Sequence, residues 1–193
     1  MKERYTNMNK SMAEKAGGEF CVVIKTDGTS EVKKLNGRNT VFDEAKGFIG
    51  CEWLDHVVVK DLGEGVHLEY LVNDNGYSDW GCDPKMVNQI ATYLHERGKP
   101  PQHHILGNVV MCLTADGDDG GEFIGMCESL AKYLKSHNDE KLLPRAKEVV
   151  KIPEELKVPD FKILSFDSSE DMIKYMGGDK SVKPASERSG FVE

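Results

Sequence analysis

Residues 71–113, LVNDNGYSDWGCDPKMVNQIATYLHERGKPPQHHILGNVVMCL, decide the fold class, because they contain a strand, a polar turn, a helix and a buried strand in succession. The clearest element is a helix over residues 84–97. Asp83 suits its N-cap, Pro84 suits its first position, and Gly98 ends the pattern. Its apolar residues recur at helical spacing: Val87, Ile90, Ala91 and Leu94.

N-terminal to this stretch, two hairpins and a short helix are expected. Apolar residues 20–24 and the alternating residues 31–35 flank a Thr-Asp-Gly-Thr turn, and residues 52–60 and 66–72 flank a second turn at 61–65. Between the hairpins, Asn39 or Thr40 would cap a short helix that is closed by glycines. Its apolar side comprises Val41, Phe42, Ala45, and Phe48 or Ile49.

C-terminal to it, residues 105–113 form the buried strand already noted, and a second amphipathic helix is expected. The apolar positions of this helix are Phe123, Met126 or Cys127, Leu130, Ala131 and Leu134. Several hairpins with two or three packed helices predict an α+β fold with a small mixed or antiparallel sheet.

The predicted domain covers residues 19–136. Residues 1–18 are polar and predict a flexible leader, with order beginning at Glu19. Residues 137–178 form a charged extension punctuated by Pro144, Pro153 and Pro159, with a short strand at 161–166 and a short helix at 169–176. Residues 179–193 predict a disordered tail.

Charge and composition narrow the class of function. The net charge of −8 and a pI near 5.3 argue against direct binding to nucleic acid or to an anionic membrane, which needs a basic surface. The five cysteines are odd in number and contain no C-x-x-C pair, which is typical of an intracellular protein. Neither a membrane-spanning run nor the apolar centre of a secretory signal is present, so we expect a cytoplasmic protein.

The acidic cluster at residues 116–122 (DGDDGGE) resembles the first half of a calcium loop. The fifth position is Gly120 and the twelfth is Cys127, where oxygen ligands are required, so the pattern fails. An acidic turn before a helix is the simpler interpretation. A phosphate cradle is rejected because three aspartates without a lysine would repel phosphate.

Two other groups carry possible chemistry. His103 and His104 do not have the paired spacing of a structural zinc site, and a polar connection is the simpler interpretation. Cys82 lies in a polar loop next to an expected helix N-terminus, which would make it at most a redox-sensitive thiol. No catalytic residue, metal ligand or cofactor is therefore assigned.

The loop from Asn73 to Asp83 places Tyr77 and Trp80 among polar residues and glycines. Aromatic residues in such a loop indicate recognition of a partner. The alternative is that Trp80 folds back over the end of the helix as a staple.

Three short motifs carry a family resemblance: LVNDNG at 71–76, NQIAT at 88–92 and ILGNVV at 105–110. With the opening hairpin, residues 19–135 resemble the phage and mobile-element family catalogued as domain of unknown function 3846. The spacing from Gly76 to Asn88 is longer than the resemblance implies, which places Tyr77, Trp80 and Cys82 in an insertion. The resemblance implies no catalytic residue and a viral or mobile-element setting.

Together these patterns predict a non-enzymatic accessory or interaction protein that binds a host protein or a small ligand in the cytoplasm, and the resemblance implies that it is of phage type. The candidate binding residues are Asn73, Asp74, Tyr77, Asp79, Trp80 and Asn88. One alternative is a metal-dependent hydrolase built on Asp116, Asp118, Asp119 and Glu122 with His103 or His104. Another is an acidic protein that mimics DNA.

Overall fold

The computed structural model describes residues 11–117, 120–157 and 168. The chain divides into two units, residues 1–158 and 159–193, and all described residues except Ser168 belong to the first. The elements of this unit, in chain order, are α1 (Met12–Ala16), β1 (Gly17–Ile24), β2 (Ser30–Lys34), α2 (Val41–Ile49), β3 (Leu54–Gly63), β4 (Val66–Asn73), α3 (Gly76–Asp79), the 3-10 turn η1 (Pro84–Met86), α4 (Gln89–His95), β5 (Val109–Gly117), β6 (Gly120–Ile124), α5 (Glu128–His137), the π-helical segment η2 (Asn138–Leu142) and α6 (Leu143–Val149).

The strands form one antiparallel sheet in the order β2-β1-β5-β4-β3, and β6 also pairs with β5. The two predicted hairpins are β1–β2 and β3–β4, and β5 lies between them. β1 pairs with β5 through Val109–Met111, and β6 pairs with it through Leu113–Gly117. The α+β prediction is therefore confirmed, with an antiparallel sheet.

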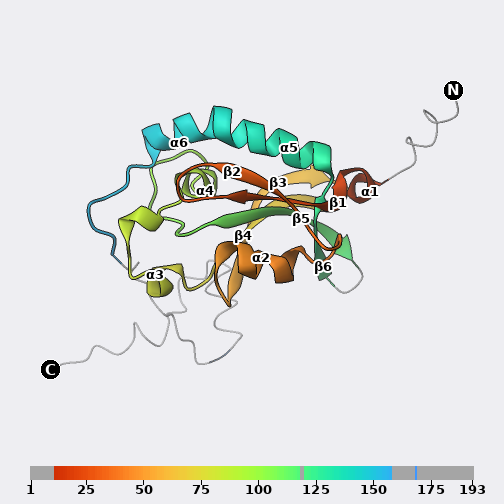
Figure 1. The fold of residues 1–193 in the computed structure, drawn as a ribbon, viewed down its shortest axis with the longest axis horizontal. Coiled ribbons are helices and arrows are strands. Elements are labelled where there is room, and N and C mark those ends of the chain that lie inside the picture. Colours follow the sequence, from red (N-terminus) through yellow and green to blue (C-terminus); the bar gives the residue numbers. More distant parts are fainter. Residues whose placement is uncertain (1–10, 118–119, 158–167, 169–193) are drawn as a thin grey trace, which may run out of the picture. The chain divides into compact units, whose positions relative to one another are not determined.

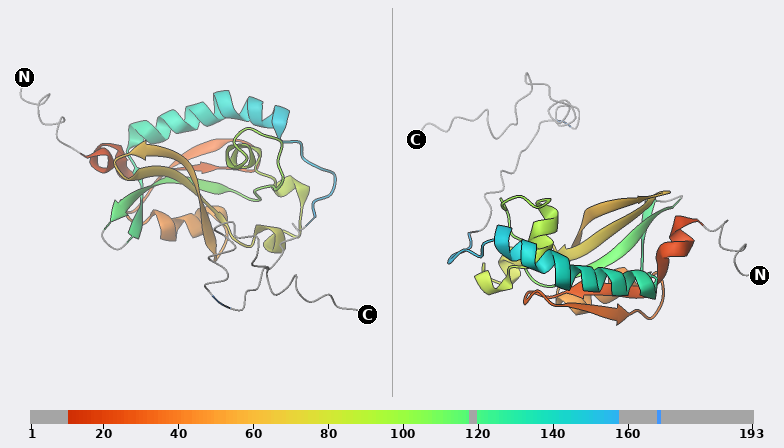
Figure 2. Two further views of the ribbon diagram at one scale, coloured as in Figure 1. Left: turned by 180° about the vertical axis from the view of Figure 1, so that it is seen from behind. Right: turned by 90° about the horizontal axis from the view of Figure 1, so that it is seen from above.

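Helices cover both faces of the sheet, with α2 on one face and α5 with α6 on the other (Figures 1 and 2). The strands alternate accordingly. Cys21, Val23, Leu71, Val110 and Cys112 pack with α2. The alternate residues pack with α4, α5 and α6 in a larger cluster that includes Val22, Ile24, Tyr70, Met111, Leu113, Ile90, Ala131, Leu134 and Ala146.

The predicted helix over residues 84–97 is wrong in its first half. It is divided into η1 and α4, because Val87 between them has extended backbone angles and forms a β-bridge with Leu106. The amide of Gly107 donates to the Met86 carbonyl at 2.7 Å, which fastens the same segment. Asp83 is an N-cap as predicted, but of η1, whereas α4 is capped by Asn88, for which the sequence predicted no capping role.

The predicted strand 105–113 is shifted by four residues. Gly107 has a φ of +81°, so the chain turns there and β5 begins at Val109. β5 continues to Gly117 and pairs with β6, so Asp116 and Glu122 of the acidic cluster lie on two neighbouring strands, and Glu122 does not precede a helix directly. Phe123 is consequently in β6, and α5 begins only at Glu128.

Regular structure extends beyond residues 19–136 at both ends. In the segment predicted as a leader, Ser11 and Glu14 form a capping box for α1, and β1 already begins at Gly17. In the segment predicted as an extension, α5 passes through η2 into α6, which packs on α4 and is fastened by Ala146 in the core. Residues 1–10, the predicted strand 161–166, the predicted helix 169–176 and the tail 179–193 lie outside the described residues.

Candidate functional site

Asn73, at the end of β4, organises the loop that carries the candidate binding residues. Its side chain is buried, and Oδ1 accepts a hydrogen bond from the Asn75 amide at 2.9 Å. Its Nδ2 donates to Asp79 Oδ2 at 2.8 Å. Asn73 therefore holds Asp79, which is exposed at the end of α3, and does not itself face a partner.

Trp80 combines the two roles that the sequence left open. One side of its indole covers Gly107 so closely that a Cβ added there would lie 2.0 Å from Trp80 Cη2. The side chain nevertheless remains half-buried and lines a cavity. Trp80 is thus anchored on the core edge and also presented to solvent.

Tyr77 serves the scaffold. Its phenolic oxygen accepts a hydrogen bond from the His104 amide at 3.0 Å, and burial raises the pKa of the phenol. Asp74 is exposed but does not line the cavity, and its amide donates to the Trp53 carbonyl at 3.2 Å. Neither side chain belongs to the site as the structure builds it.

Asn88 is a fully buried structural residue, so its prediction as a binding residue is wrong. Its Nδ2 donates to the carbonyls of Ile24 and Gly107, each at 3.0 Å. Its Oδ1 accepts from the Ala91 amide at 3.1 Å, which caps α4. With every polar atom engaged, Asn88 ties α4 to β1 and to the turn before β5.

The cavity beside Trp80 has a volume of about 440 Å³ and lies at the C-terminal end of α2. We call it the polar cavity. The residues that line it come from the segment before β3 and the segment after β4. These segments are neighbours because Leu54, the first residue of β3, pairs with Asn73, the last residue of β4. Its lining residues are Gly50, Cys51, Glu52, Trp53, Asn75, Asp79 and Trp80.

Sequence reasoning missed Cys51, Glu52 and Trp53. They could have been found from the predicted hairpin of residues 52–60 and 66–72. Pairing of these two strands places Trp53 opposite the segment that follows β4. Trp53 is 66% exposed, which is unusual for tryptophan. Both tryptophans of the chain therefore line the same cavity.

The polar cavity is electronegative. Neither Glu52 nor Asp79 forms an ion pair with any other described residue. The C-terminal end of α2, which closes at Gly50 in a left-handed conformation, adds partial negative charge. Burial and then the Asp79 carboxylate raise the pKa of the Cys51 thiol, and Lys46 opposes the shift.

This arrangement favours binding of a cation over covalent chemistry. A thiol with a raised pKa is protonated at neutral pH and is a weak nucleophile. Two indoles with two carboxylates, by contrast, are the groups that surround an ammonium or guanidinium ion in proteins.

The residues of the hydrolase hypothesis do not converge. Asp116 lies near the far end of β5, whereas His103 and His104 precede its start, and the strand between them spans roughly 20 Å. Glu122 accepts a hydrogen bond from Asn39 Nδ2 at 2.7 Å. Asp118 and Asp119 lie outside the described residues. Within residues 11–117, 120–157 and 168, no group of three or more His, Cys, Asp or Glu side chains is placed to hold a metal ion.

The cysteines differ from expectation in one respect. Cys21 and Cys112 are buried, as their apolar surroundings predict, but Cys51, Cys82 and Cys127 are all half-buried, so Cys82 is not distinguished by exposure. Its Sγ contacts the Tyr77 carbonyl at 3.7 Å.

Comparison of the chain with protein-family models, curated proteins and solved structures gave no match. In the part of the chain that the structure describes, no helix has the length and apolar character to cross a membrane.

Proposed function

We propose that the chain is a non-enzymatic interaction protein that binds a basic segment of a partner protein in the polar cavity. The observation that carries this proposal is the meeting of Trp53 and Trp80 with the unpaired carboxylates of Glu52 and Asp79 around one cavity. A lysine or arginine side chain has the charge and shape that these groups complement.

The energetics favour a positioned cation in this cavity over one on an open surface. An exposed ion pair contributes only about 0–1 kcal/mol, because water and salt screen it. Contact with an indole face adds about 0.5–2 kcal/mol, depending on desolvation. Two indoles with two carboxylates therefore supply enough for a specific anchor residue within a larger interface.

The setting of this function is part of the proposal. A viral or mobile-element role, in which the partner is a host protein, is proposed from the family resemblance alone. All five cysteines are free thiols, which supports a cytoplasmic setting, that of the host cell if the protein is viral.

Tryptophan fluorescence tests the proposal directly, because both tryptophans line the cavity. A (Gly-Arg)4 peptide should change the emission in a saturable way, and a (Gly-Glu)4 peptide should not. Isothermal titration should show about three- to tenfold weaker binding of the arginine peptide to Trp53→Ala and to Asp79→Asn. Asp79→Asn keeps an oxygen that can accept from Asn73, so it removes the charge with little disturbance of the loop.

Tyr133→Ala is the matched control, because Tyr133 is an aromatic residue of α5 that is 63% exposed and does not line the polar cavity. It should bind the peptide like the wild type. Affinity purification from lysate with the same three variants should then lose the partner with Trp53→Ala and Asp79→Asn only. Equal binding by Trp53→Ala and Tyr133→Ala would refute the assignment of the cavity.

The two alternatives make different demands. The metal-dependent hydrolase requires stoichiometric metal that is lost in Asp118→Ala, which metal analysis of the purified protein measures. The DNA mimic requires binding to a nucleic-acid-handling protein that weakens steeply with salt and is insensitive to Trp53→Ala.

A further inference from the structure

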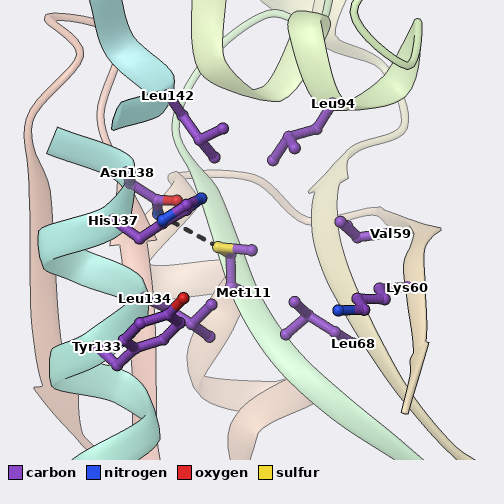
Figure 3. Close-up of a pocket in the computed structure, with 10 residues that line it drawn as sticks. All are labelled: Val59, Lys60, Leu68, Leu94, Met111, Tyr133, Leu134, His137, Asn138 and Leu142. Carbon is purple, nitrogen blue, oxygen red and sulfur yellow. Dashed lines mark hydrogen bonds between the residues drawn. The ribbon is translucent and has the colours of Figure 1, made fainter. Parts of the chain in front are cut away.

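A second cavity lies between the sheet and the helices on the face opposite α2 (Figure 3). We call it the apolar cavity. Its volume is about 320 Å³, and its walls come from β3, β4, β5, α4, α5 and η2. Half of its ten lining residues are aliphatic (Val59, Leu68, Leu94, Leu134 and Leu142), and Tyr133 and His137 also line it.

One buried polar atom in this wall, the side-chain oxygen of Asn138, has no hydrogen-bond partner among the described residues. Asn138 is fully buried, and its Nδ2 donates to Met111 Sδ at 3.4 Å. Its Oδ1 has no hydrogen-bond partner among the described residues. Exchanging the amide oxygen and nitrogen does not help, because a thioether cannot donate a hydrogen bond and the exchanged oxygen would face sulfur.

An unpaired buried carbonyl costs about 1–3 kcal/mol, so its retention needs an explanation. Asn138 is also the first residue of η2, the π-helical segment that joins α5 to α6. Such segments cost backbone stability and occur frequently at functional sites. Oδ1 is covered by neighbouring atoms, so a ligand that enters the cavity must displace them to reach it. Both features are explained if such a ligand then donates a hydrogen bond to Asn138 Oδ1.

The rest of the wall limits the ligand. Apolar cavities of about 150 Å³ admit benzene, so a cavity about twice as large has room for a two-ring molecule. The thioether of Met111 favours an aromatic occupant. At one side Lys60, which forms no ion pair with another described residue, turns its ammonium end toward the cavity (Figure 3).

We propose that the apolar cavity is a binding site for a small heteroaromatic molecule of the indole class, whose ring N–H donates to Asn138 Oδ1. An acidic substituent on such a ligand would pair with Lys60. This site is separate from the polar cavity and does not depend on the function proposed for it, since the two cavities share no lining residue.

The test uses the full chain and matched probes. Indole should perturb the NMR signals of the Met111 and Leu134 methyl groups. 1-Methylindole, which lacks the donor, should bind about fivefold more weakly, as expected for the loss of one hydrogen bond. Indole-3-acetate should bind more tightly than indole, and Lys60→Gln should abolish that difference.

Asn138→Leu replaces the amide by a hydrocarbon with the same branching, so it should bind indole and 1-methylindole equally. Trp53→Ala should bind indole like the wild type, which separates this site from the polar cavity. The proposal is overturned if millimolar indole leaves the Met111 and Leu134 signals unchanged, or if wild type does not prefer indole to 1-methylindole. The wild-type comparison decides the matter even if Asn138→Leu fails to fold.

Discussion

Two buried asparagines, one beside each cavity, are bonded in different ways. Asn73 supports the polar cavity, and both ends of its amide are engaged, by Asn75 and Asp79. Asn138 lines the apolar cavity, and only its nitrogen is engaged, by the weak acceptor Met111 Sδ. A satisfied amide is explained by the structure that it holds in place, whereas an unsatisfied one points to something that the chain does not supply.

The cavities also differ in what forms them. Loop residues line the polar cavity, so most of its side chains can be changed without disturbing the core, and Trp80 over Gly107 is the exception. Strand and helix residues line the apolar cavity, so its walls are part of the core. The effects of substitutions on the free energy of unfolding therefore test which residues near each cavity also stabilise the fold.

The largest effect is expected for Gly107→Ala, which should lower the free energy of unfolding by about 4 kcal/mol. A φ of +81° is strained for alanine, and the new Cβ would overlap the Trp80 indole. Urea denaturation measures the change. Trp80 should also move, so the folded variant should lose binding of the arginine peptide in the polar cavity.

The control for Gly107→Ala is Gly47→Ala. Gly47 is an exposed residue inside α2, and nothing lies within 4 Å of a Cβ added there. Alanine should stabilise the helix by about 0.5–1 kcal/mol. Equal stabilities of the two variants would show that Trp80 is not anchored on Gly107.

The next effect is expected for Asn88→Ala, at about 3 kcal/mol. The substitution removes three buried hydrogen bonds, to the carbonyls of Ile24 and Gly107 and from the amide of Ala91. Thermal and urea unfolding measure the loss. At a temperature where the variant is folded, peptide binding should be unchanged, because Asn88 does not line the polar cavity.

Asn108→Ala is the matched control for Asn88→Ala. Asn108 is a half-buried asparagine whose bonds to Thr26 and Phe48 are longer, at 3.3 and 3.4 Å. Its loss should be below about 1 kcal/mol. A result in which both variants lose the same stability would contradict the assignment of Asn88 as the residue that ties α4 to β1.

These substitutions also show how far sequence reasoning reached. The hairpins and α2 were predictable because alternation, helical spacing and turn glycines are local signals, although Thr40 at the N-cap of α2 makes no capping hydrogen bond with its side chain. The break at Val87 was not, because it depends on pairing with Leu106, which lies 19 residues later in the sequence. The apolar residues keep helical spacing across the break, but the pairing of Val87 with Leu106 interrupts the helix there.

The candidate site was predictable in part for the same reason. Trp80 and Asp79 were found from composition, because an aromatic residue among polar loop residues is a local signal. The buried position of Asn88 was not predictable, because the sequence does not show that its side chain bonds to two carbonyls and one amide in the interior. Asn138 was not singled out, since the absence of a partner for one oxygen is visible only in three dimensions.

A smaller effect concerns the thiols in the core beneath α2. Burial raises the pKa of Cys21 from 9.0 to about 12, with a smaller contribution from Glu44 that Lys33 opposes. The folded state thus favours the neutral thiol, and this contribution to stability is complete below pH 9 and is lost as the pH rises from 9 toward 12. At pH 10 the loss should be on the order of 1 kcal/mol.

Urea unfolding of the wild type and of Cys21→Ala at pH 7 and pH 10 measures this loss. The wild type should lose more stability between the two pH values than the variant does, by about the stated amount. Parallel declines would contradict a buried neutral thiol at this position. Iodoacetamide should correspondingly modify the half-buried Cys51 before Cys21 in the native protein.

The smallest effect, and the one that most directly tests the comparison of the two asparagines, is expected for Asn138→Leu. Replacing an unsatisfied buried amide by a hydrocarbon with the same branching removes a desolvation cost, which offsets the cost of packing the larger side chain, so the stability of the variant should lie within about 1 kcal/mol of the wild type. Asn73→Leu should instead lose about 1–2 kcal/mol, because two good hydrogen bonds disappear and Asp79 is released. Urea unfolding without added ligand measures both. A loss of 2 kcal/mol or more in Asn138→Leu would mean that the carbonyl is satisfied within the folded chain, and the reason for placing a ligand beside it would disappear.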